Sequence, residues 1–327
     1  MTKVLGMGNA LVDVLTQLPN DEALHQLNLP KGSMQLIDAN FMNRVIDITS
    51  NLPKTMAAGG SAANTINGLA NLGVSTAFIG KIGPDSIGQA FANDMRANNI
   101  EPILLNGKAQ SGQALVLVSP DSERTFATHL GAAIELTPND LRPEMFAQAD
   151  YFHIEGYLVQ NHDLIRHALE MAHAAGIKIS LDLASYNVVE DNREFLHNML
   201  KEHVNIVFAN EEEARAFGGD SAEDTLNQLS SLTDVAVVKL GSAGSLIRRS
   251  NEQVRVGVAK VDKVIDTTGA GDLYSAGFIY GLCQNRPLSQ CGELGAITSG
   301  AVIGVMGPKM DKDRWQQIHQ QITKILS

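Results

Sequence analysis

The sequence contains few cysteines and no long hydrophobic run. Its 327 residues include only two cysteines, Cys283 and Cys291, whose spacing is not that of a metal site. A secreted protein built on disulfides is therefore not expected, and a reduced, cytoplasmic protein is. No apolar stretch reaches the length of a membrane-spanning helix, and the N-terminus lacks the pattern of a signal peptide. We expect neither a membrane partner nor a structural metal.

Basic residues are also in the minority. The chain carries 25 Lys and Arg against 36 Asp and Glu, which gives a formal net charge of −11. Such a protein is a poor partner for a polyanion, so nucleic acid is not expected as a ligand. A phosphorylated ligand would need local positive features that oppose the overall field. The hydrophobic share of 44% is ordinary for a globular protein, and the length suits one large α/β domain or two ordinary ones.

Three familiar ligand-binding motifs are incomplete. Gly6 and Gly8 follow an apolar run, as in a dinucleotide-binding fingerprint, but the third glycine and the following helix are missing. Gly59 and Gly60 precede a predicted helix, but the Lys-Ser/Thr pair of a Walker A loop does not follow them. The segment around Ser61 also lacks the final glycine of a nucleophile elbow. A dehydrogenase is therefore disfavoured.

Two polar residues interrupt the apolar segment 4–14. We expect this segment to form a strand, on which Asn9 and Asp13 could point to one face. A buried carboxylate without partners is costly. Asp13 is therefore either satisfied by backbone donors, as a turn cap would be, or free to accept two hydroxyl groups of a vicinal diol. This stretch alone leaves both interpretations open.

The paired glycines Gly59 and Gly60 open a predicted helix that ends at Gly73. Two glycines let the backbone approach a ligand closely, and Asn64, one turn into the helix, could reach the same ligand. The alternative is a simple N-cap at Ser61. The doubled glycine favours a ligand site.

Residues 149–239 alternate between predicted strands and helices. The strands are expected at 150–154, 178–182, 205–209 and 234–239. The helices are expected at 161–175, 191–202, 211–217 and 221–231. Repeated βα units predict a doubly wound, mostly parallel sheet flanked by helices, with ligands at the carboxyl ends of the strands. Polar residues occur at those ends, namely His153, Glu155, Asp182, Asn210, Glu213 and Lys239. Most suit caps or packing, although the acidic helix start after Asn210 also suits Mg²⁺ held near phosphates.

Two further strands, 113–118 and 124–130, are separated by turn residues and predict a hairpin. With the region 14–37, the hairpin could form a small sheet apart from the main body. Hairpins placed over a site act as lids. We expect a lid built from parts of about 12–37 and 101–130.

The segment Asp266-Thr-Thr-Gly-Ala-Gly-Asp272 carries the clearest chemistry. It lies between an alternating, strand-like run at 253–265 and an apolar, helix-like run at 273–282. The small residues leave backbone N–H groups uncovered at a helix N-terminus, which makes an anion hole. A carboxylate beside it suits a base that deprotonates an attacking hydroxyl. The alternative is a helix cap on a tight turn.

Together, three motifs resemble the ribokinase-like (PfkB-type) carbohydrate kinase family. They are Gly59-Gly-Ser-Ala-Ala-Asn64, Asn210-x-x-Glu213 and Asp266-Thr-Thr-Gly-Ala-Gly-Asp272, in this order over essentially the whole chain. The segments 9–13, 124–133 and 266–291 look most like the adenosine-kinase-type branch. The resemblance implies one large α/β kinase domain over residues 1–327.

The resemblance implies roles for matching residues. Asp272 would be the catalytic base, beside an anion hole made by Gly269, Ala270 and Gly271. The acceptor would be held by Asn9, Asp13, Gly59, Gly60 and Asn64, with Arg124 approaching from the lid. ATP and Mg²⁺ would lie near Asn210, Glu213, Lys239, Gly241 and Gly244. In members that require a monovalent cation such as K⁺, the cation would lie near Asp266, Thr268 and residues 302–307.

The predicted function is ATP-dependent phosphoryl transfer to the primary hydroxyl of a nucleoside or sugar, with an adenosine-like nucleoside as the first choice. One alternative is a sugar kinase for ribose, fructose or 2-keto-3-deoxygluconate. Another is a regulator that binds nucleosides or sugars without catalysis. Adenosine kinases often stack the purine on an aromatic ring after the mid-chain strand, and here Tyr157 is shifted by one position or the ring is absent. The protein would be a monomer or a homodimer formed through the lid.

Overall fold

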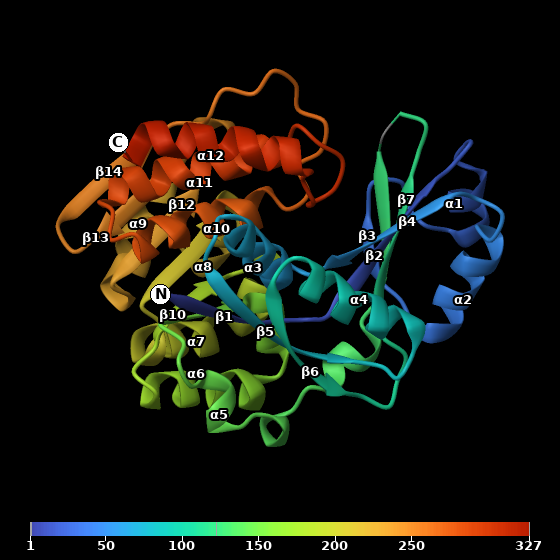
Figure 1. The fold of residues 1–327 in the computed structure, drawn as a ribbon, viewed down its shortest axis with the longest axis horizontal. Helices are drawn as coiled ribbons and strands as arrows, with labels where there is room; N and C mark the ends of the chain where they lie inside the picture. Colours follow the sequence, from blue (N-terminus) through green and yellow to red (C-terminus); the bar gives the residue numbers. More distant parts are fainter. Residues whose placement is uncertain (1, 122, 327) are drawn as a thin grey trace.

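A nine-stranded sheet forms the centre of the computed structural model, which describes residues 2–121 and 123–326 (Figure 1). In this sheet, the strands β6, β5, β1, β9, β10, β11 and β12 lie side by side in this order and are parallel, and β13 and β14 add an antiparallel hairpin at the β12 edge. In spatial order the strands are β14 (Glu252–Val256), β13 (Ser245–Arg249), β12 (Val235–Lys239), β11 (Ile206–Asn210), β10 (Lys178–Asp182), β9 (Tyr151–Glu155), β1 (Lys3–Met7), β5 (Ser75–Ile82) and β6 (Ile100–Asn106). The predicted doubly wound, mostly parallel sheet is confirmed.

Helices cover both faces of this sheet because each buried strand is apolar on both sides. On β12, Val235 and Val237 belong to one core, while Ala236 and Val238 belong to the other. The first face carries α3 (Ser61–Asn71), α4 (Ser86–Ala97), α10 (Ala270–Cys283) and α11 (Leu288–Val302), with α12 (Lys312–Leu326) packed outside α11. The second carries α5 (Pro143–Phe146), α6 (His162–Ala174), α7 (Tyr186–His203), α8 (Glu211–Phe217) and α9 (Ala222–Leu232). Short 3₁₀ helices are η1 (Gly131–Glu135), η2 (Pro138–Asp140), η3 (Gly156–Gln160) and η4 (Gly241–Ala243).

A second, five-stranded sheet stands beside the main body on the right of Figure 1 and is called the small sheet below. Its strands are, in order, β3 (Met34–Leu36), β8 (Arg124–His129), β7 (Gly112–Val118), β2 (Leu11–Gln17) and β4 (Lys54–Gly59). The helices α1 (Glu22–Leu27) and α2 (Ala39–Ile48) lie on its outer side. The predicted antiparallel hairpin is β7 and β8. Strand β4 was not indicated by the sequence, and β6, within the range 101–130, joins the large sheet.

Two predicted strands were wrong in extent. The segment 4–14 divides into β1 and β2, which belong to different sheets, so the chain crosses between the sheets at Gly8–Ala10. The strand predicted over 253–265 ends at Val256, at the edge of the large sheet. Beyond it, the N–H groups of Ile265 and Asp266 donate to the carbonyl oxygen of Ile303, which replaces strand pairing.

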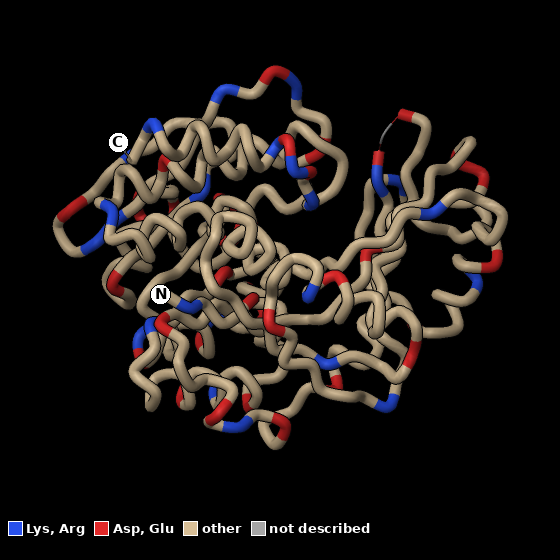
Figure 2. The backbone as a smooth tube through the Cα atoms, viewed as in Figure 1, with Lys and Arg blue, Asp and Glu red and all other residues tan. Residues whose placement is uncertain are grey.

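Some helix boundaries also differ. The helix predicted at 191–202 begins at Tyr186. Helix α4 begins at Ser86, where the Asp85 carboxylate accepts a hydrogen bond from the N–H of Gly88. The helix predicted at 211–217 is confirmed with those bounds. Within residues 2–121 and 123–326, no helix is both long and apolar enough to cross a membrane. Acidic and basic residues are interspersed along the chain (Figure 2).

Candidate active site

A cavity of about 760 Å³ lies at the carboxyl ends of the parallel strands, where the large sheet faces the small sheet. Parallel strands present their carboxyl ends along one edge, so the last residues of β9, β10, β11 and β12 meet there. Those residues are Glu155, Asp182, Asn210 and Lys239, and all four line the cavity. The sheet topology thus brings together side chains from four separate βα units.

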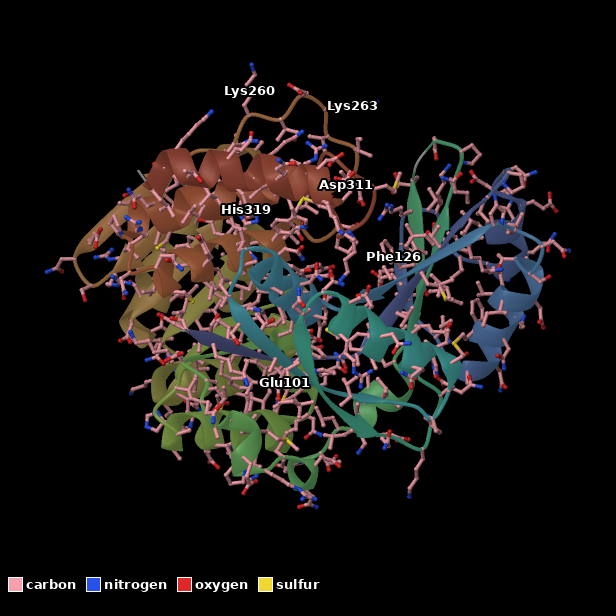
Figure 3. The ribbon with its side chains drawn as sticks, in the orientation of Figure 1. Glu101, Phe126, Lys260, Lys263, Asp311 and His319 are labelled. Carbon is pink, nitrogen blue, oxygen red and sulfur yellow. The ribbon has the colours of Figure 1, made fainter. Side chains whose placement is uncertain are left out.

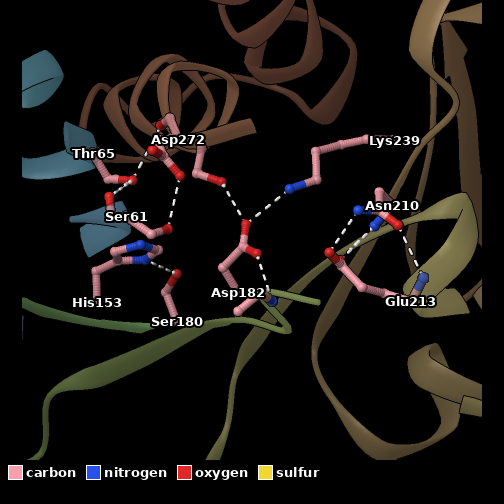
Figure 4. A network of polar contacts seen from close by, with 11 residues as sticks. Ser61, Thr65, His153, Ser180, Asp182, Asn210, Glu213, Lys239 and Asp272 are labelled. Carbon is pink, nitrogen blue, oxygen red and sulfur yellow. Dashed lines mark hydrogen bonds and ion pairs between the residues drawn. The ribbon is translucent and has the colours of Figure 1, made fainter. Parts of the chain in front are cut away.

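Asp272 sits in the first turn of α10 and points into this cavity (Figure 4). Its Oδ1 accepts a hydrogen bond from the Ser61 hydroxyl at 2.7 Å, and its Oδ2 accepts one from Asn64 Nδ2 at 2.9 Å. Loss of solvent raises the pKa of Asp272 to about 6, against the lowering effect of these two hydrogen bonds. A carboxylate with this pKa is ionised at neutral pH and basic enough to accept a proton.

The turn before α10 leaves backbone donors exposed to the cavity. Gly269 is the N-cap residue with φ of 76°, a left-handed conformation that favours glycine. The N–H of Ala270 donates to the carbonyl oxygen of Thr267 at 3.1 Å, so it is used within the turn. Among the described residues, the N–H groups of Gly269, Gly271 and Asp272 have no acceptor. The predicted hole therefore differs in composition: Ala270 is engaged and the Asp272 N–H is free.

Lys239 and Asp182 form a largely buried ion pair next to Asp272. The Nζ atom of Lys239 lies 2.8 Å from Oδ2 of Asp182, and only 14% and 7% of the two side chains are exposed. Ser275, one turn along α10, donates to the same carboxylate at 3.4 Å. A side chain at Gly271 would place its Cβ 3.1 Å from Lys239 Nζ, so glycine lets the helix start approach the ammonium group. The ammonium group thus adds positive charge beside the free N–H donors.

Asn210 and Glu213 form a reciprocal capping box at the start of α8. The Asn210 side chain accepts from the N–H of Glu213 at 2.9 Å, and the Glu213 carboxylate accepts from the Asn210 N–H at 2.8 Å. Burial raises the pKa of Glu213 to about 7, with Asp182 adding to the effect. The helix-start interpretation is confirmed, and the same carboxylate lines the cavity.

Glu155 holds the glycine-rich entry to α3. Its carboxylate is buried and accepts from the N–H and the side-chain amide of Asn9, at 2.9 and 2.7 Å, and from the N–H of Ala62 at 2.9 Å. Burial raises the pKa of Glu155 to about 7. Asn9 lies in the crossover between β1 and β2, so Glu155 ties this crossover to the start of α3. Asn9 therefore does not lie on a strand, as predicted, but in this crossover, where Glu155 holds its side chain.

Asp13 lies in the middle of β2 and faces the cavity, so it caps no turn. It packs against Gly59 of β4, where an added Cβ would lie 2.4 Å from Asp13 Oδ1. Burial raises the pKa of Asp13 to about 6, while the positive charges of Lys309 and Arg124 lower it. Among the described residues, no hydrogen bond to the Asp13 carboxylate occurs. Its oxygens are therefore open to ligand hydroxyl groups.

Arg124 connects the small sheet to the segment before α10. Its Nη1 lies 2.7 Å from Oδ2 of Asp266, with 9% and 7% of the two side chains exposed, and 3.3 Å from the Thr268 hydroxyl. Asp266 also accepts from the N–H and hydroxyl of Thr268, at 3.0 and 2.8 Å, and from the N–H of Gly307 at 2.6 Å. Arg124 does not line the cavity in this arrangement. The ion pair fixes the small sheet against the loop that carries Gly269 to Asp272.

Apolar side chains also line the cavity. Tyr157 and Leu136 line it from the main body, together with Ile134, whose side chain is 63% exposed. Phe126, labelled in Figure 3, lines it from β8, and Met34 from β3. The cavity therefore offers carboxylates and N–H donors together with flat and branched apolar surfaces.

Most of the predicted site residues meet at this cavity. Those that line it are Asn9, Asp13, Gly60, Asn64, Asn210, Glu213, Lys239, Thr268, Gly271 and Asp272. Gly59, Gly269 and Ala270 adjoin these residues in the chain, while Gly241 and Gly244 flank η4 just beyond Lys239. Sequence reasoning assigned Ser61 only a cap, and it gave Glu155 and Asp182 no role in a site beyond caps or packing at strand ends. Their position at strand ends was the available signal for the two acids.

Comparison with known proteins decides the family. Residues 51–313 match the pfkB family of carbohydrate kinases, which is most of the chain. The chain belongs to this family. The predicted resemblance and the ribokinase-like fold are thereby confirmed, and so is the predicted enzyme class of sugar or nucleoside kinase. A kinase of the pfkB family uses ATP as its phosphate donor.

Relatives of this pfkB family kinase include proteins named for both substrate classes. The solved structure of an adenosine kinase from Sinorhizobium meliloti is 36% identical, with a TM-score of 0.86 over 98% of this chain and 99% of that one. A probable sugar kinase from Rhizobium etli CFN 42 is 33% identical, with a TM-score of 0.88 over 98% and 99%. A 5-dehydro-2-deoxygluconokinase from Geobacillus thermodenitrificans is 26% identical over 82% of this chain and 84% of its own.

Proposed function

We propose that this pfkB family kinase transfers the γ-phosphoryl group of ATP to the primary hydroxyl of a purine nucleoside, with adenosine as the first candidate. The observation that carries the proposal is the mixed lining of the cavity. It combines the carboxylates of Asp272 and Asp13 with the apolar surfaces of Tyr157, Leu136 and Phe126. The hydroxyl groups of a ribose suit the carboxylates, and a flat heterocycle suits the apolar side chains. A volume of about 760 Å³ exceeds the needs of a single sugar ring.

Asp272 acts as the general base in this proposal. Its carboxylate accepts the proton of the primary hydroxyl while that oxygen attacks the γ-phosphorus and the bond to the ADP oxygen breaks. Ser61 and Asn64 hold the carboxylate in place. Negative charge on the transferred group is met by the free N–H groups of Gly269, Gly271 and Asp272 and by Lys239. Such positioning and charge stabilisation are the main contributions expected for phosphoryl transfer.

The residues at the strand ends fit a nucleotide carrying Mg²⁺. Glu213 and Asp182 line the cavity with carboxylates whose own hydrogen bonds are made, so they suit a metal reached through water rather than by direct ligation. Bound Mg²⁺ would neutralise phosphate charge. Asn210 and Glu213 would organise the hydrated phosphates, and Gly241 and Gly244 would border the nucleotide.

A monovalent cation would lie at the loop containing Asp266 and Thr268. The Asp266 carboxylate already accepts hydrogen bonds from Thr268 and Gly307 and pairs with Arg124. The backbone carbonyl oxygens of this loop and of residues 302–307 are therefore the remaining ligands for the cation. Potassium would then act by ordering the turn before α10. Comparing turnover in K⁺ and in tetramethylammonium salts at one ionic strength tests this point.

The acceptor is identified by ADP production with ATP and Mg²⁺ against adenosine, inosine, ribose, fructose and 2-keto-3-deoxygluconate. We expect adenosine to show the highest kcat/KM. A higher kcat/KM for a free sugar would identify that sugar, and not a nucleoside, as the acceptor. If no acceptor raises ADP above the water background while ligands still raise the melting temperature, a binding regulator replaces the enzyme.

Tyr157→Ala tests whether a purine packs against this ring. We expect it to lower kcat/KM for adenosine by about 10-fold, the worth of one lost aromatic contact, and to leave any activity with ribose unchanged. Tyr186→Ala is a matched control, because Tyr186 is 45% exposed and lies outside the cavity lining. Equal losses of kcat/KM for adenosine and ribose would contradict the placement of the purine ring against Tyr157.

A further inference from the structure

A second cavity, of about 460 Å³, lies at the opposite end of the large sheet. It is lined by residues at the amino ends of four parallel strands: Tyr151, Lys178, Ile206 with Asn205, and Val235 with Asp234. The end of β13 adds Arg249, and the turn after it adds Ser250. Leu282 comes from the last turn of α10, and Asn285 and Arg286 come from the segment just after it. Because α10 begins at the active site and ends here, its 14 residues separate the two cavities by about 20 Å.

The lining is cationic in a protein of net charge −11. Lys178, Arg249 and Arg286 contribute three positive charges, and Asp234 contributes one negative charge. Among the described residues, none of the three cations forms an ion pair with a carboxylate. Cations are usually dispersed or paired when their role is only to keep a protein in solution. Three unpaired cations around one hollow indicate an anionic ligand.

Arg286 supplies an independent observation. Its Nε atom is buried and, within the described part of the chain, has no hydrogen-bond partner. A buried donor without an acceptor costs free energy, so such groups in native proteins are normally completed by water or a ligand. The N–H groups of residues 284–286 donate to the carbonyl oxygens of Tyr280, Gly281 and Leu282, so these carbonyls at the end of α10 already have partners.

The other lining groups narrow the chemistry of the ligand. Asp234 Oδ2 accepts from Asn205 Nδ2 at 3.0 Å, which orients the carboxylate and leaves Oδ1 for a hydroxyl donor. The side chains of Ile206, Val235 and Leu282 are buried and form an apolar floor. The volume lies within the range of small-molecule sites, and it encloses too little space for a macromolecule.

We propose that this cavity binds a small phosphate monoester that also carries hydroxyl groups, at a site separate from the phosphoryl-transfer site. The guanidinium groups of Arg249 and Arg286 and the ammonium group of Lys178 bind the phosphate oxygens. Asp234 accepts a hydroxyl of the ligand. The proposal does not depend on which acceptor the active site uses.

Titration calorimetry with glycerol 3-phosphate tests the site on the full chain. Saturating Mg²⁺ and a non-hydrolysable ATP analogue first occupy the phosphate-binding part of the active site. We expect one further binding event for glycerol 3-phosphate and none for glycerol, which lacks the phosphate. Arg249→Gln and Arg286→Gln should each raise Kd by at least 10-fold.

Three comparisons make the result decisive. Arg166→Gln is the matched control, because Arg166 lies on α6 outside this cavity and should leave Kd unchanged. Both test variants should keep the melting temperature and the kinase turnover of the wild type. If Arg286→Gln unfolds, the Kd of Arg249→Gln decides alone, because Arg249 is exposed and its replacement should leave the fold intact. Wild-type Kd in Arg249→Gln, or loss of all binding once the ATP analogue is present, would overturn the proposal while leaving the kinase assignment untouched.

Discussion

The Nζ atom of Lys239 lies 2.8 Å from Oδ2 of Asp182, and the two residues, 57 positions apart, end β12 and β10, the strands on either side of β11. This ion pair adjoins both the start of α10 and the carboxylate of Glu213. The charges of Lys239 and Asp182 therefore compensate each other before any nucleotide is bound. Removing either partner leaves a charge without compensation in a largely buried place.

Replacing one partner of this ion pair should lower the free energy of unfolding more than replacing both partners. Lys239→Met leaves Asp182 buried and unpaired, so we expect a loss of about 3–5 kcal/mol in the free energy of unfolding. The double variant Lys239→Met/Asp182→Asn should recover much of that loss, because no charge remains. Urea unfolding of the four proteins in the cycle measures the coupling. A double variant as unstable as Lys239→Met would contradict the pairing.

Replacing the proposed base should separate activity from stability. Asp272→Asn should lower kcat by about 10²–10⁴-fold, because the asparagine cannot accept the hydroxyl proton. The fold should accommodate it, since the buried Oδ1 of Asn64 has no partner among the described residues and a flip of the Asn64 amide would supply an acceptor. Single-turnover kinetics and far-ultraviolet circular dichroism check both parts. Near-normal kcat in Asp272→Asn would remove this residue from the chemistry.

The same variant should change the pH dependence of stability. Desolvation raises the pKa of Asp272 to about 6, above its unfolded value of 3.8, so the folded protein binds this proton more tightly than the unfolded chain does. The contribution of Asp272 to the stability of the wild type therefore falls as pH rises from about 4 to about 6. Relative to the wild type, Asp272→Asn should gain up to about 2 kcal/mol over this window and keep the gain at pH 8. Melting temperatures from pH 4 to pH 8 measure the difference, which should not narrow as pH rises.

Activity should depend on the ionisation of two carboxylates. Asp272 must be ionised to accept a proton and Asp13 to accept ligand hydroxyls, and the pKa of each is raised to about 6. We expect kcat/KM for the acceptor to rise through pH 6 with a slope steeper than one proton. In Asp13→Asn, the acidic part of the curve of log kcat/KM against pH should have a slope of one, and the maximum kcat/KM should be lower. A pH-independent kcat/KM between pH 5 and 7 would contradict both roles.

Arg124 should matter more than an exposed cation of the same small sheet. Arg124→Met removes an ion pair whose partners are 9% and 7% exposed, and it leaves Asp266 without its counter-charge. We expect a lower kcat/KM and faster proteolysis of the β7–β8 hairpin, because the sheet is no longer fixed against residues 266–268. Lys31→Met is the control, since Lys31 pairs with Asp21 and Asp121 at the surface, where such pairs contribute about 0–1 kcal/mol. Equal behaviour of the two variants would argue against a closing role for Arg124.

A side chain at the start of α10 should damage transfer more than folding. Gly271→Val places a branched group against Lys239 Nζ and among the free N–H donors, so we expect kcat to fall by about 10²–10³-fold. Gly257→Ala is the control, because an added Cβ there meets nothing within 4 Å. Unchanged kcat in Gly271→Val would show that these donors do not receive the phosphoryl group.

The sequence by itself determined the features that depend on neighbouring residues. The βα rhythm of residues 149–239, the helix start after Gly60 and the capping box of Asn210 and Glu213 all follow from local pattern and hydrogen bonding. The motif ending at Asp272, together with Gly59–Asn64 and Asn210-x-x-Glu213, predicted the family, which is confirmed. The assignment of Asp272 as the base stays a prediction.

Only the tertiary structure decided the relationships between distant segments. Ser61 and Asp272 are 211 positions apart and meet because α3 and α10 pack on the same face of the sheet. No local signal shows that segment 4–14 divides between two sheets, or that Arg124 pairs with Asp266 rather than facing the cavity. These outcomes follow from sheet order and from the need to pair buried charges, and both are properties of the folded chain as a whole.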